Sequence, residues 1–438
     1  MDKLRINGYL WAVLLFLGLW LWAFSALMIA PVWDEVNFLL TVNQFTGFWQ
    51  GLGVIWLGNT LYRPLAISFL AGVLKLLPFD LAWPLLRTFN AAMVLASFWL
   101  IADAAKRYAA SYVCRPEKPH PLCNNHNQFI LCCYWLAVFL SPAALIVATW
   151  YPNIFDASCL LFIAIGIAVL GRGRWLSAGI AFGVAWFCKE TAIFVLPLLT
   201  YLFFTHPHSR KITVNSLFVY IGISAIYWCL RNRVLVLGST QDIHPFVFSQ
   251  ILPTLQVVAM RFSSPGITIL PGIIGLLFTV VLALSTRKRV FFCFVLMLIL
   301  GSTILYLGLP AGMLSKDTPL LNSAPFDARF FHIPLALLMF ALLLNGRAWP
   351  FLLLTLSFGA SIPFEFLHYQ KFQLAYQSYF KLAAQKPGGI IIFLNKGQGV
   401  QEASGDFGHL KIGEYPQADY LLNPQNGDLT PTHGIDSR

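Results

Sequence analysis

Long apolar stretches alternate with short polar segments along most of the chain. A helix needs about 20 apolar residues to cross the hydrocarbon core of a bilayer, and these stretches reach or approach that length. The pattern therefore predicts an all-α polytopic membrane protein with eleven transmembrane helices. We expect the spans at residues 9–30, 83–104, 128–149, 154–170, 175–188, 190–204, 213–230, 266–286, 290–309, 330–345 and 349–367.

The segment between the first two predicted spans is also rich in apolar residues. Residues 61–77, LYRPLAISFLAGVLKLL, contain Arg63 and Lys75. Because charged side chains are costly in hydrocarbon, we expect an amphipathic helix that lies along or dips into the outer face of the membrane. The alternative is that it crosses together with residues 38–58, which would give thirteen spans. The first run, residues 9–30, is longer than the core of a signal peptide and is expected to be a retained signal anchor.

One apolar run is interrupted by the polar sequence CKET. Residues 175–204 are flanked at both ends by basic clusters, and Lys189 and Glu190 stand near the middle. Two short helices that meet near the outer surface fit this pattern better than one long helix. The sequence therefore predicts a break at CKET, with both charged residues on the outer side.

Composition and charge support the membrane assignment. Hydrophobic residues make up 58% of the 438 residues and charged residues 11%, and the mean hydropathy is +0.70, which argues against a water-soluble domain. The net charge of +11 comes from small basic clusters between apolar runs, as expected for loops held in the cytoplasm, so nucleic-acid binding is disfavoured. With the N-terminus inside, the basic inner loops are residues 105–127, 171–174, 208–211, 286–289 and 345–347.

The eight cysteines do not form a recognisable framework, because most lie inside apolar runs, where cysteine behaves as a small hydrophobe. Cys114, His120, Cys123 and His126 share one basic loop. Their spacing fits no common zinc site, so we interpret this group as incidental.

The composition changes after His368. Residues 370–385, QKFQLAYQSYFKLAAQ, are typical of an amphipathic helix, and GGIIIFLN at 388–395 is typical of a strand. The end is polar and rich in Gly, Pro and Asn. We therefore divide the chain into a membrane domain, residues 1–367, with its first outer loop at 31–82, and a small extracytoplasmic α/β domain, residues 368–438. This second domain is expected to be partly disordered towards its end.

Acidic residues are unevenly distributed across the predicted topology. Only Asp2, Asp103 and Glu117 fall inside, whereas the acids predicted outside before the tail are Asp34, Glu35, Asp80, Asp156, Glu190, Asp242, Asp317, Asp327 and Glu365. Cations accompany them, against the positive-inside tendency: Arg63, Lys75, Arg87, Lys189, Arg231, Arg233, Arg261, Lys316 and Arg329. Arginine and lysine bind phosphate through charge-assisted hydrogen bonds, and a carboxylate beside them can accept a proton from a hydroxyl. The outer face is therefore the predicted place of the chemistry.

Four stretches, taken in order, resemble GT-C glycosyltransferases. These are WDE at 33–35, the two segments YRPLAISFLAGVLKLL and LLRTFNAAMVLASFWLIADAAKRY, SPAALIVATWYPNIFDASCLLF, and GIAFGVAWFCKETAIFVLPLL. They cover about residues 1–235, with a weaker similarity at DARFFHIP. The chain is similar in particular to the protein mannosyltransferase and aminoarabinose transferase-like group.

The resemblance implies that a sugar moves from a polyprenyl-phosphate donor to a lipid, glycan or protein acceptor on the extracytoplasmic face. It implies that Asp34 or Glu35 is the catalytic base and that the sugar carbon is inverted. The candidates for binding the donor phosphate are Lys189, Arg231, Arg233, Arg329 and Arg63, with Asp156 and Glu190 as possible additional acids. A divalent metal serves some members of the class, and no other cofactor is implied. Localisation in the bacterial inner membrane, as part of cell-envelope glycan synthesis, is the expectation.

Other interpretations remain open at this point. Asp156 can simply complement the dipole at a helix N-terminus, and Arg231 and Arg233 can be interfacial anchors. His332 is interpreted as a packing or interfacial residue. The alternatives to an enzyme are a transporter or flippase of lipid-linked sugar and a non-catalytic assembly partner. A transporter needs charged residues along a path across the bilayer, whereas the predicted charges gather at one side.

Overall fold

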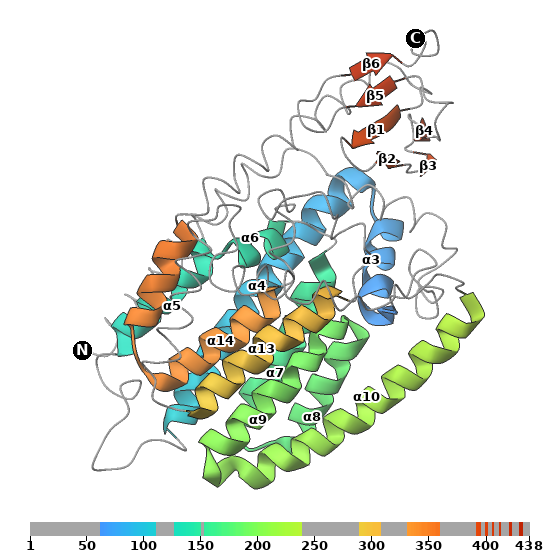
Figure 1. The fold of residues 1–438 in the computed structure, drawn as a ribbon. Helices are drawn as coiled ribbons and strands as arrows, with labels where there is room; N and C mark the ends of the chain where they lie inside the picture. Colours follow the sequence, from blue (N-terminus) through green and yellow to red (C-terminus); the bar gives the residue numbers. More distant parts are fainter. Residues whose placement is uncertain are drawn as a thin grey trace.

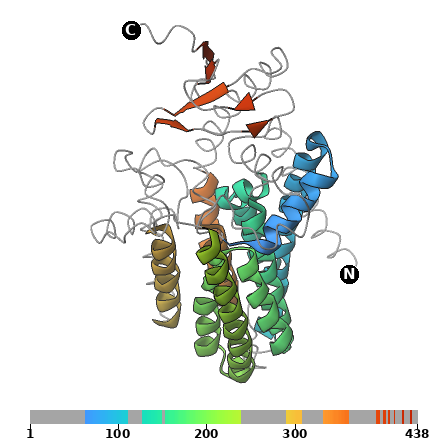
Figure 2. The same cartoon turned by 90° about the vertical axis from the view of Figure 1, so that its right-hand side faces the viewer.

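The computed structural model describes residues 62–110, 127–149, 153–238, 289–307 and 331–359, together with six short strands between residues 391 and 431. The helices, in chain order, are α3 (Pro64–Leu76), α4 (Phe79–Tyr108), α5 (Asn127–Leu140), α6 (Pro142–Thr149), α7 (Ile154–Leu170), α8 (Trp175–Val184), α9 (Val195–Thr205), α10 (Arg210–Gly238), α13 (Arg289–Leu307) and α14 (His332–Asn345). Three 3-10 segments, η6 (Ala185–Phe187), η7 (Glu190–Phe194) and η8 (Pro207–Ser209), connect some of them, and a further apolar helix follows at Trp349–Gly359. Figures 1 and 2 show these helices packed side by side.

Two of these helices are long and apolar enough to cross a membrane, Leu81–Tyr108 and Arg210–Arg233. A third candidate is the pair Gln128–Leu140 and Pro142–Thr149, which is bent by 57° at Ser141. Proline at position 142 removes a backbone donor, which accounts for the break at that point. The structure thus supports a helical membrane protein.

The predicted spans can be compared with the described helices one by one. The spans at 83–104 and 213–230 coincide with the two long helices, and 128–149 with the bent pair. Six further spans overlap apolar helices that are individually shorter than a full crossing: 154–170, 175–188, 190–204, 290–309, 330–345 and 349–367. Of these spans, residues 308–309, 330 and 360–367 lie outside the described residues. The spans at 9–30 and 266–286 lie outside the described residues, so the total of eleven or thirteen stays a prediction.

Close helix packing is clearest between α8 and α10. A Cβ atom added at Gly183 would lie 2.6 Å from Cβ of Ile223, and one at Gly179 would lie 2.7 Å from the carbonyl oxygen of Ser216. Glycines spaced by four residues on one helix face let two backbones approach closely in a membrane protein. The two glycines therefore set the distance between α8 and α10.

The turns that join the helices gather at one end of the bundle. The ring of Tyr108, at the end of α4, lies against Gly171, which follows α7, and its centroid is 5.6 Å from that of His206, which follows α9. Basic residues flank these three points: Lys106, Arg107, Arg172, Arg174, Arg210 and Lys211. We call this the basic end. Asp156, in the first turn of α7, is about 20 Å away along the helix, at a rise of 1.5 Å per residue.

α3 packs against α4, α7 and η6 away from the basic end. It begins with Pro64, which is well suited to the first helical turn, and it buries Ile67, Leu70 and Leu74. Lys75 and Leu76 are exposed. The helix is thus present where the sequence predicted an amphipathic one.

The strands near the C-terminus form two small sheets. β1 (Ile391–Asn395), β2 (Gly399–Gln401), β5 (Tyr420–Leu422) and β6 (Leu429–Pro431) form a sheet in the order β2-β1-β5-β6, in which only β1 and β5 are parallel. β3 (Gly405–Asp406) pairs with β4 (Lys411–Ile412). β1 falls within the stretch predicted as a strand. The helix predicted at 370–385 lies outside the described residues, so the α/β domain stays a prediction.

Candidate functional site

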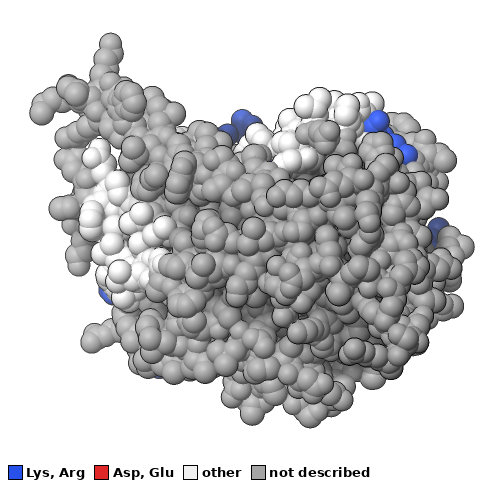
Figure 3. Space-filling view, turned by 90° about the horizontal axis from the view of Figure 1, so that it is seen from above, with Lys and Arg blue, Asp and Glu red and all other residues white. Residues whose placement is uncertain are grey.

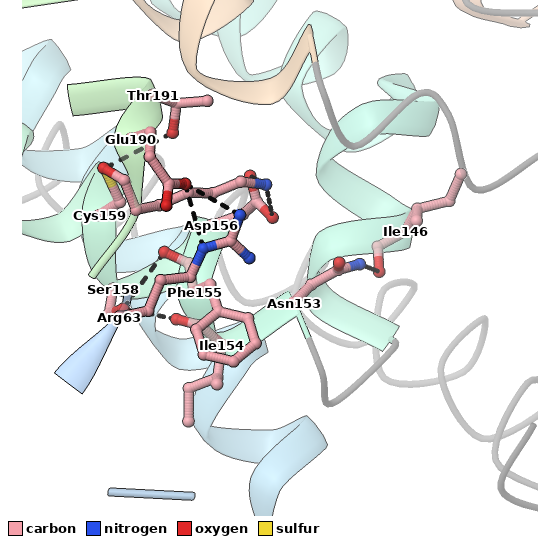
Figure 4. A network of polar contacts seen from close by, with 11 residues as sticks. Arg63, Ile146, Asn153, Ile154, Phe155, Asp156, Ser158, Cys159, Glu190 and Thr191 are labelled. Atoms are coloured by element: carbon pink, nitrogen blue, oxygen red, sulfur yellow. Dashed lines mark hydrogen bonds and ion pairs between the residues drawn. The ribbon is translucent and has the colours of Figure 1, made fainter. Parts of the chain in front are cut away.

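Four charged residues from three distant segments meet near the start of α7. Figure 4 labels three of them, Arg63, Asp156 and Glu190. Asp156 lies in the first turn of α7, Lys189 and Glu190 lie at the junction of η6 and η7, and Arg63 directly precedes α3. Asp156 pairs with Lys189, and Arg63 pairs with Glu190. We refer to these four residues as the charged cluster.

The pair of Asp156 and Lys189 is almost completely shielded from solvent. The Lys189 Nζ atom donates to both carboxylate oxygens of Asp156, at 2.6 Å to Oδ1 and 2.5 Å to Oδ2. The two side chains are 3% and 5% exposed. A charge buried this deeply is tolerated only with a partner, so each residue accounts for the burial of the other.

The backbone around Lys189 explains how its side chain reaches Asp156. Lys189 itself is extended, with φ −164° and ψ 149°, so the helix that ends at η6 does not continue into η7. The Sγ atom of Cys159 donates to the Lys189 carbonyl at 3.8 Å, and the hydroxyl of Tyr220 donates to the Ala192 carbonyl at 3.0 Å. The predicted break at CKET is therefore present, and side chains of α7 and α10 donate to backbone carbonyls at the break and just after it.

The pair of Arg63 and Glu190 is less deeply buried and is asymmetric. The Nε and Nη2 atoms of Arg63 both donate to Oε2 of Glu190, at 3.1 Å and 2.9 Å, and the side chains are 11% and 16% exposed. The Arg63 guanidinium also lies 5.1 Å from the ring centroid of Phe155. Oε1 of Glu190 is buried and has no hydrogen-bond partner in the described part of the chain.

Electrostatics keep Arg63 charged in this setting. Burial acts to lower the pKa of Arg63, but the carboxylates of Glu190 and Asp156 act in the opposite direction and leave the pKa above its ordinary value. Both acids thus lie close enough to Arg63 to act on it. The two ion pairs form one electrostatic unit.

Arg231 adjoins this unit through Tyr227. The Tyr227 hydroxyl donates to the Tyr62 carbonyl at 2.8 Å, and it lies within electrostatic range of Glu190, Arg63 and Arg231. The Arg231 guanidinium is 4.7 Å from the ring centroid of Trp228. This stacking fits the anchor interpretation of Arg231, while its position beside Tyr227 places its charge next to the charged cluster.

The predicted site residues thus divide into three groups. Arg63, Asp156, Lys189, Glu190 and Arg231 are brought together in space. Arg233 is exposed and lies two residues after Arg231 on α10. The predicted catalytic acids Asp34 and Glu35, and the cation Arg329, lie outside the described residues.

Two of the cations predicted to bind phosphate form ion pairs with acids of the protein. Lys189 is bound by Asp156, and Arg63 by Glu190, so in this structure both are paired with the acids that the sequence suggested as additional site residues. In the space-filling view of Figure 3, described basic side chains are visible at the rim and no described acid is visible. The side chains of Asp156 and Glu190 are 3% and 16% exposed, so the acids of the charged cluster are largely buried.

The sequence alone does not predict that several polar residues of these helices are buried. Arg87 and Asn90 of α4 are fully buried, and Arg87 lies 4.7 Å from the ring centroid of Trp83. His332 is also fully buried, packs edge-on against Phe98, and lies within electrostatic range of Asp156 and Lys189. The packing interpretation of His332 agrees with the contact to Phe98. Tyr62 and Tyr227 could not be distinguished from the many aromatic residues at predicted membrane borders.

No group of three or more His, Cys, Asp or Glu residues that could hold a metal ion occurs among the described residues. Asp156 uses both carboxylate oxygens on Lys189, which leaves it poorly suited to a cation. A site that involves Asp34 lies outside the described residues.

The described geometry provides several cations, one buried carboxylate oxygen without a hydrogen-bond partner, and the rings of Phe155 and Trp228 beside two of the cations. Such a combination suits a ligand that carries both an anionic group and polar hydroxyls. Comparison with protein-family models, with curated proteins and with solved structures finds no match to this chain.

Proposed function

We propose that the chain is a GT-C type membrane glycosyltransferase that moves a hexose or pentose from a polyprenyl-phosphate donor to an acceptor on the extracytoplasmic face. The observation that carries the proposal is the convergence of Arg63, Asp156, Lys189, Glu190 and Arg231 from four separate segments. Buried ionisable groups in a membrane protein are costly and are generally retained for function. The resemblance in order of the sequence motifs supports the same activity.

The distribution of charge supports the proposed side of the membrane. The basic end carries six lysine and arginine residues at three helix junctions, and cytoplasmic ends are enriched in such residues. The charged cluster lies at the opposite end of α7. This arrangement supports an extracytoplasmic site and argues for an enzyme over a transporter, whose charges would line a path through the bilayer.

The proposed reaction is a single displacement at the anomeric carbon of the sugar. The bond between that carbon and the lipid phosphate oxygen breaks, a bond to the acceptor oxygen or nitrogen forms, and Asp34 or Glu35 accepts the proton that the acceptor loses. The leaving group is the polyprenyl phosphate. Inversion follows because no covalent intermediate with the protein is formed.

Cations near the leaving group would stabilise the negative charge that grows on it. Of the predicted phosphate-binding residues, Arg231, Arg233 and Arg329 are assigned this role. Lys189 and Arg63, which have acid partners in the structure, are assigned to maintaining the shape and the positive potential of the site. If the reaction uses a divalent metal, Asp34 would be the candidate to hold it, and the metal would help to neutralise the charge of the donor phosphate.

The direct test is sugar transfer by the purified protein in detergent. Wild type and the variants Asp34→Asn and Glu35→Gln are incubated with radiolabelled polyprenyl-phosphate sugars and membrane acceptors, with and without EDTA. We expect transfer by wild type and a loss of about 100-fold or more in the variant that lacks the base, as is typical of general base catalysis. Transfer that is unchanged in both variants would remove the proposed base, and binding of the donor without transfer by wild type would favour a non-catalytic partner.

A further inference from the structure

We propose that Glu190 binds a carbohydrate hydroxyl through Oε1, and that Arg63 is the positioning residue that orients the Glu190 carboxylate for this contact. The inference rests on the proposed function and adds to it a residue that recognises the sugar or the acceptor. It is carried by the one-sided geometry of the pair of Arg63 and Glu190.

The two oxygens of Glu190 are used differently. Two nitrogens of Arg63 converge on Oε2, at 3.1 Å and 2.9 Å. A carboxylate and a guanidinium commonly pair through two parallel hydrogen bonds, one to each oxygen. Here Oε1 is instead left buried without a partner in the described part of the chain. A buried acceptor without a donor is unfavourable, so the geometry points to a ligand group that bonds to Oε1.

The surrounding charges define what that ligand group can be. Arg63 and Lys189 are cationic and buried near Glu190, and Arg231 lies beside the same tyrosine hydroxyl as Glu190. A metal cation or an ammonium group is disfavoured here, because these three cations outnumber the two carboxylates of Asp156 and Glu190 and leave a net positive charge. A phosphate oxygen has no hydrogen to donate to Oε1 and would be repelled by the carboxylate. A neutral hydroxyl satisfies both conditions, because it donates a hydrogen bond and carries no charge.

Asp156 provides the contrast within the same cluster. Both of its oxygens accept from Nζ of Lys189, and its side chain is 3% exposed. Asp156 therefore has its charge and its oxygens occupied by the protein. Of the two acids in the charged cluster, Glu190 alone has an oxygen without a hydrogen-bond partner among the described residues.

The position of Glu190 also depends on Arg63 specifically. The guanidinium rests against the Phe155 ring, with 5.1 Å from Cζ to the ring centroid, while Nε and Nη2 reach Oε2. A lysine has a single point of donation and no planar group to stack in this way. Arg63→Lys thus keeps the charge but loses the orientation of the carboxylate.

The test separates the sugar from the lipid phosphate. Affinities of wild type, Glu190→Gln and Arg63→Lys are measured by tryptophan fluorescence for undecaprenyl phosphate and for the same lipid carrying glucose, mannose or arabinose. Wild type is expected to bind at least one sugar-bearing lipid more tightly than the bare lipid. Glu190→Gln loses a charge-assisted hydrogen bond and is expected to lose this preference, about 10-fold or more, while its affinity for the bare lipid is kept.

Arg63→Lys is expected to lose part of the preference, because its carboxylate is still present but is no longer oriented. The melting temperature of Glu190→Gln is expected to stay within a few degrees of wild type, since an amide oxygen can still accept from Arg63. If Glu190→Gln fails to fold, Arg63→Lys carries the test through the same loss of preference.

The source of the hydroxyl is distinguished by steady-state kinetics. If the hydroxyl belongs to the donor sugar, Glu190→Gln shows the change in donor affinity described above. If it belongs to the acceptor, Glu190→Gln keeps both lipid affinities and has a raised acceptor KM. Either result supports the inference. Unchanged lipid affinities together with an unchanged acceptor KM in Glu190→Gln would overturn it while the proposed function stands. If wild type neither binds the lipids nor transfers sugar, the proposed function fails, and the inference fails with it.

Discussion

Removal of one partner of the buried pair of Asp156 and Lys189 is expected to destabilise the protein strongly. In Lys189→Met, the carboxylate of Asp156 is left in a site where it is 3% exposed and has lost the ammonium that bonds to both of its oxygens. A buried pair broken in this way typically costs about 3–5 kcal/mol. The size of the effect comes from the uncompensated charge more than from the lost contact itself.

Removal of both partners should be much less harmful. In the double variant Asp156→Leu with Lys189→Met, no charge remains to be desolvated, and replacements of this kind are often neutral or stabilising by about 1–4 kcal/mol. The control is Arg107→Met, which breaks the exposed pair with Asp103, whose N–O distance is 2.7 Å and whose side chains are 46% and 31% exposed. Such a pair four residues apart on a helix contributes about 0.3–0.5 kcal/mol.

Thermal unfolding in detergent, followed by tryptophan fluorescence, measures the order of stabilities. The structure predicts that Lys189→Met melts at the lowest temperature, that the double variant recovers most of the loss, and that Arg107→Met is close to wild type. The reasoning is refuted if Lys189→Met and the double variant melt together, or if Lys189→Met is no less stable than Arg107→Met.

Two further predictions concern helix packing and the tyrosine at the edge of the cluster. Gly183→Ala is expected to destabilise the protein by about 1–3 kcal/mol, because the added Cβ would lie 2.6 Å from Cβ of Ile223. The matched control is Gly222→Ala, because no heavy atom lies within 4 Å of the Cβ that it adds. It should be neutral or stabilising by up to about 1 kcal/mol. Equal melting temperatures of Gly183→Ala and Gly222→Ala would contradict the packing described. Tyr227→Phe should cost about 1 kcal/mol because the Tyr62 carbonyl loses its 2.8 Å donor, and an unchanged melting temperature would show that this bond adds nothing to stability.

The helices could be predicted from the sequence to the extent that length and apolar composition determine them. The runs at 83–104 and 213–230 appear as continuous helices that meet the length of a span. The break at CKET was also predictable, because two adjacent charged residues within thirty apolar ones are costly in one continuous helix. The bend between α5 and α6 was not predicted, although Pro142 was a signal for it.

The partners within the charged cluster could not be predicted from the sequence. Arg63 and Glu190 are 127 positions apart, and Asp156 and Lys189 are 33 apart. Hydrophobic periodicity places a residue on a helix face or at a helix end, but it carries no information on which distant ends meet. The sequence therefore predicts Lys189 and Arg63 as phosphate ligands, whereas the structure places a carboxylate against each of them. The same limitation hid the role of Tyr227, whose partner Tyr62 is 165 positions away.

In the proposed topology, the charged cluster and the basic end face opposite sides of the membrane, with the cluster away from the cytoplasm. Arg233 and Arg174 are exposed arginines at the two ends, so Arg233→Cys and Arg174→Cys form a matched pair of reporters. Each variant is treated with a membrane-impermeant maleimide in intact and in permeabilised cells, and the labelling of the unsubstituted chain is subtracted. We expect Arg233→Cys to be labelled in intact cells and Arg174→Cys only after permeabilisation. The reverse pattern would place the cluster in the cytoplasm and contradict the account.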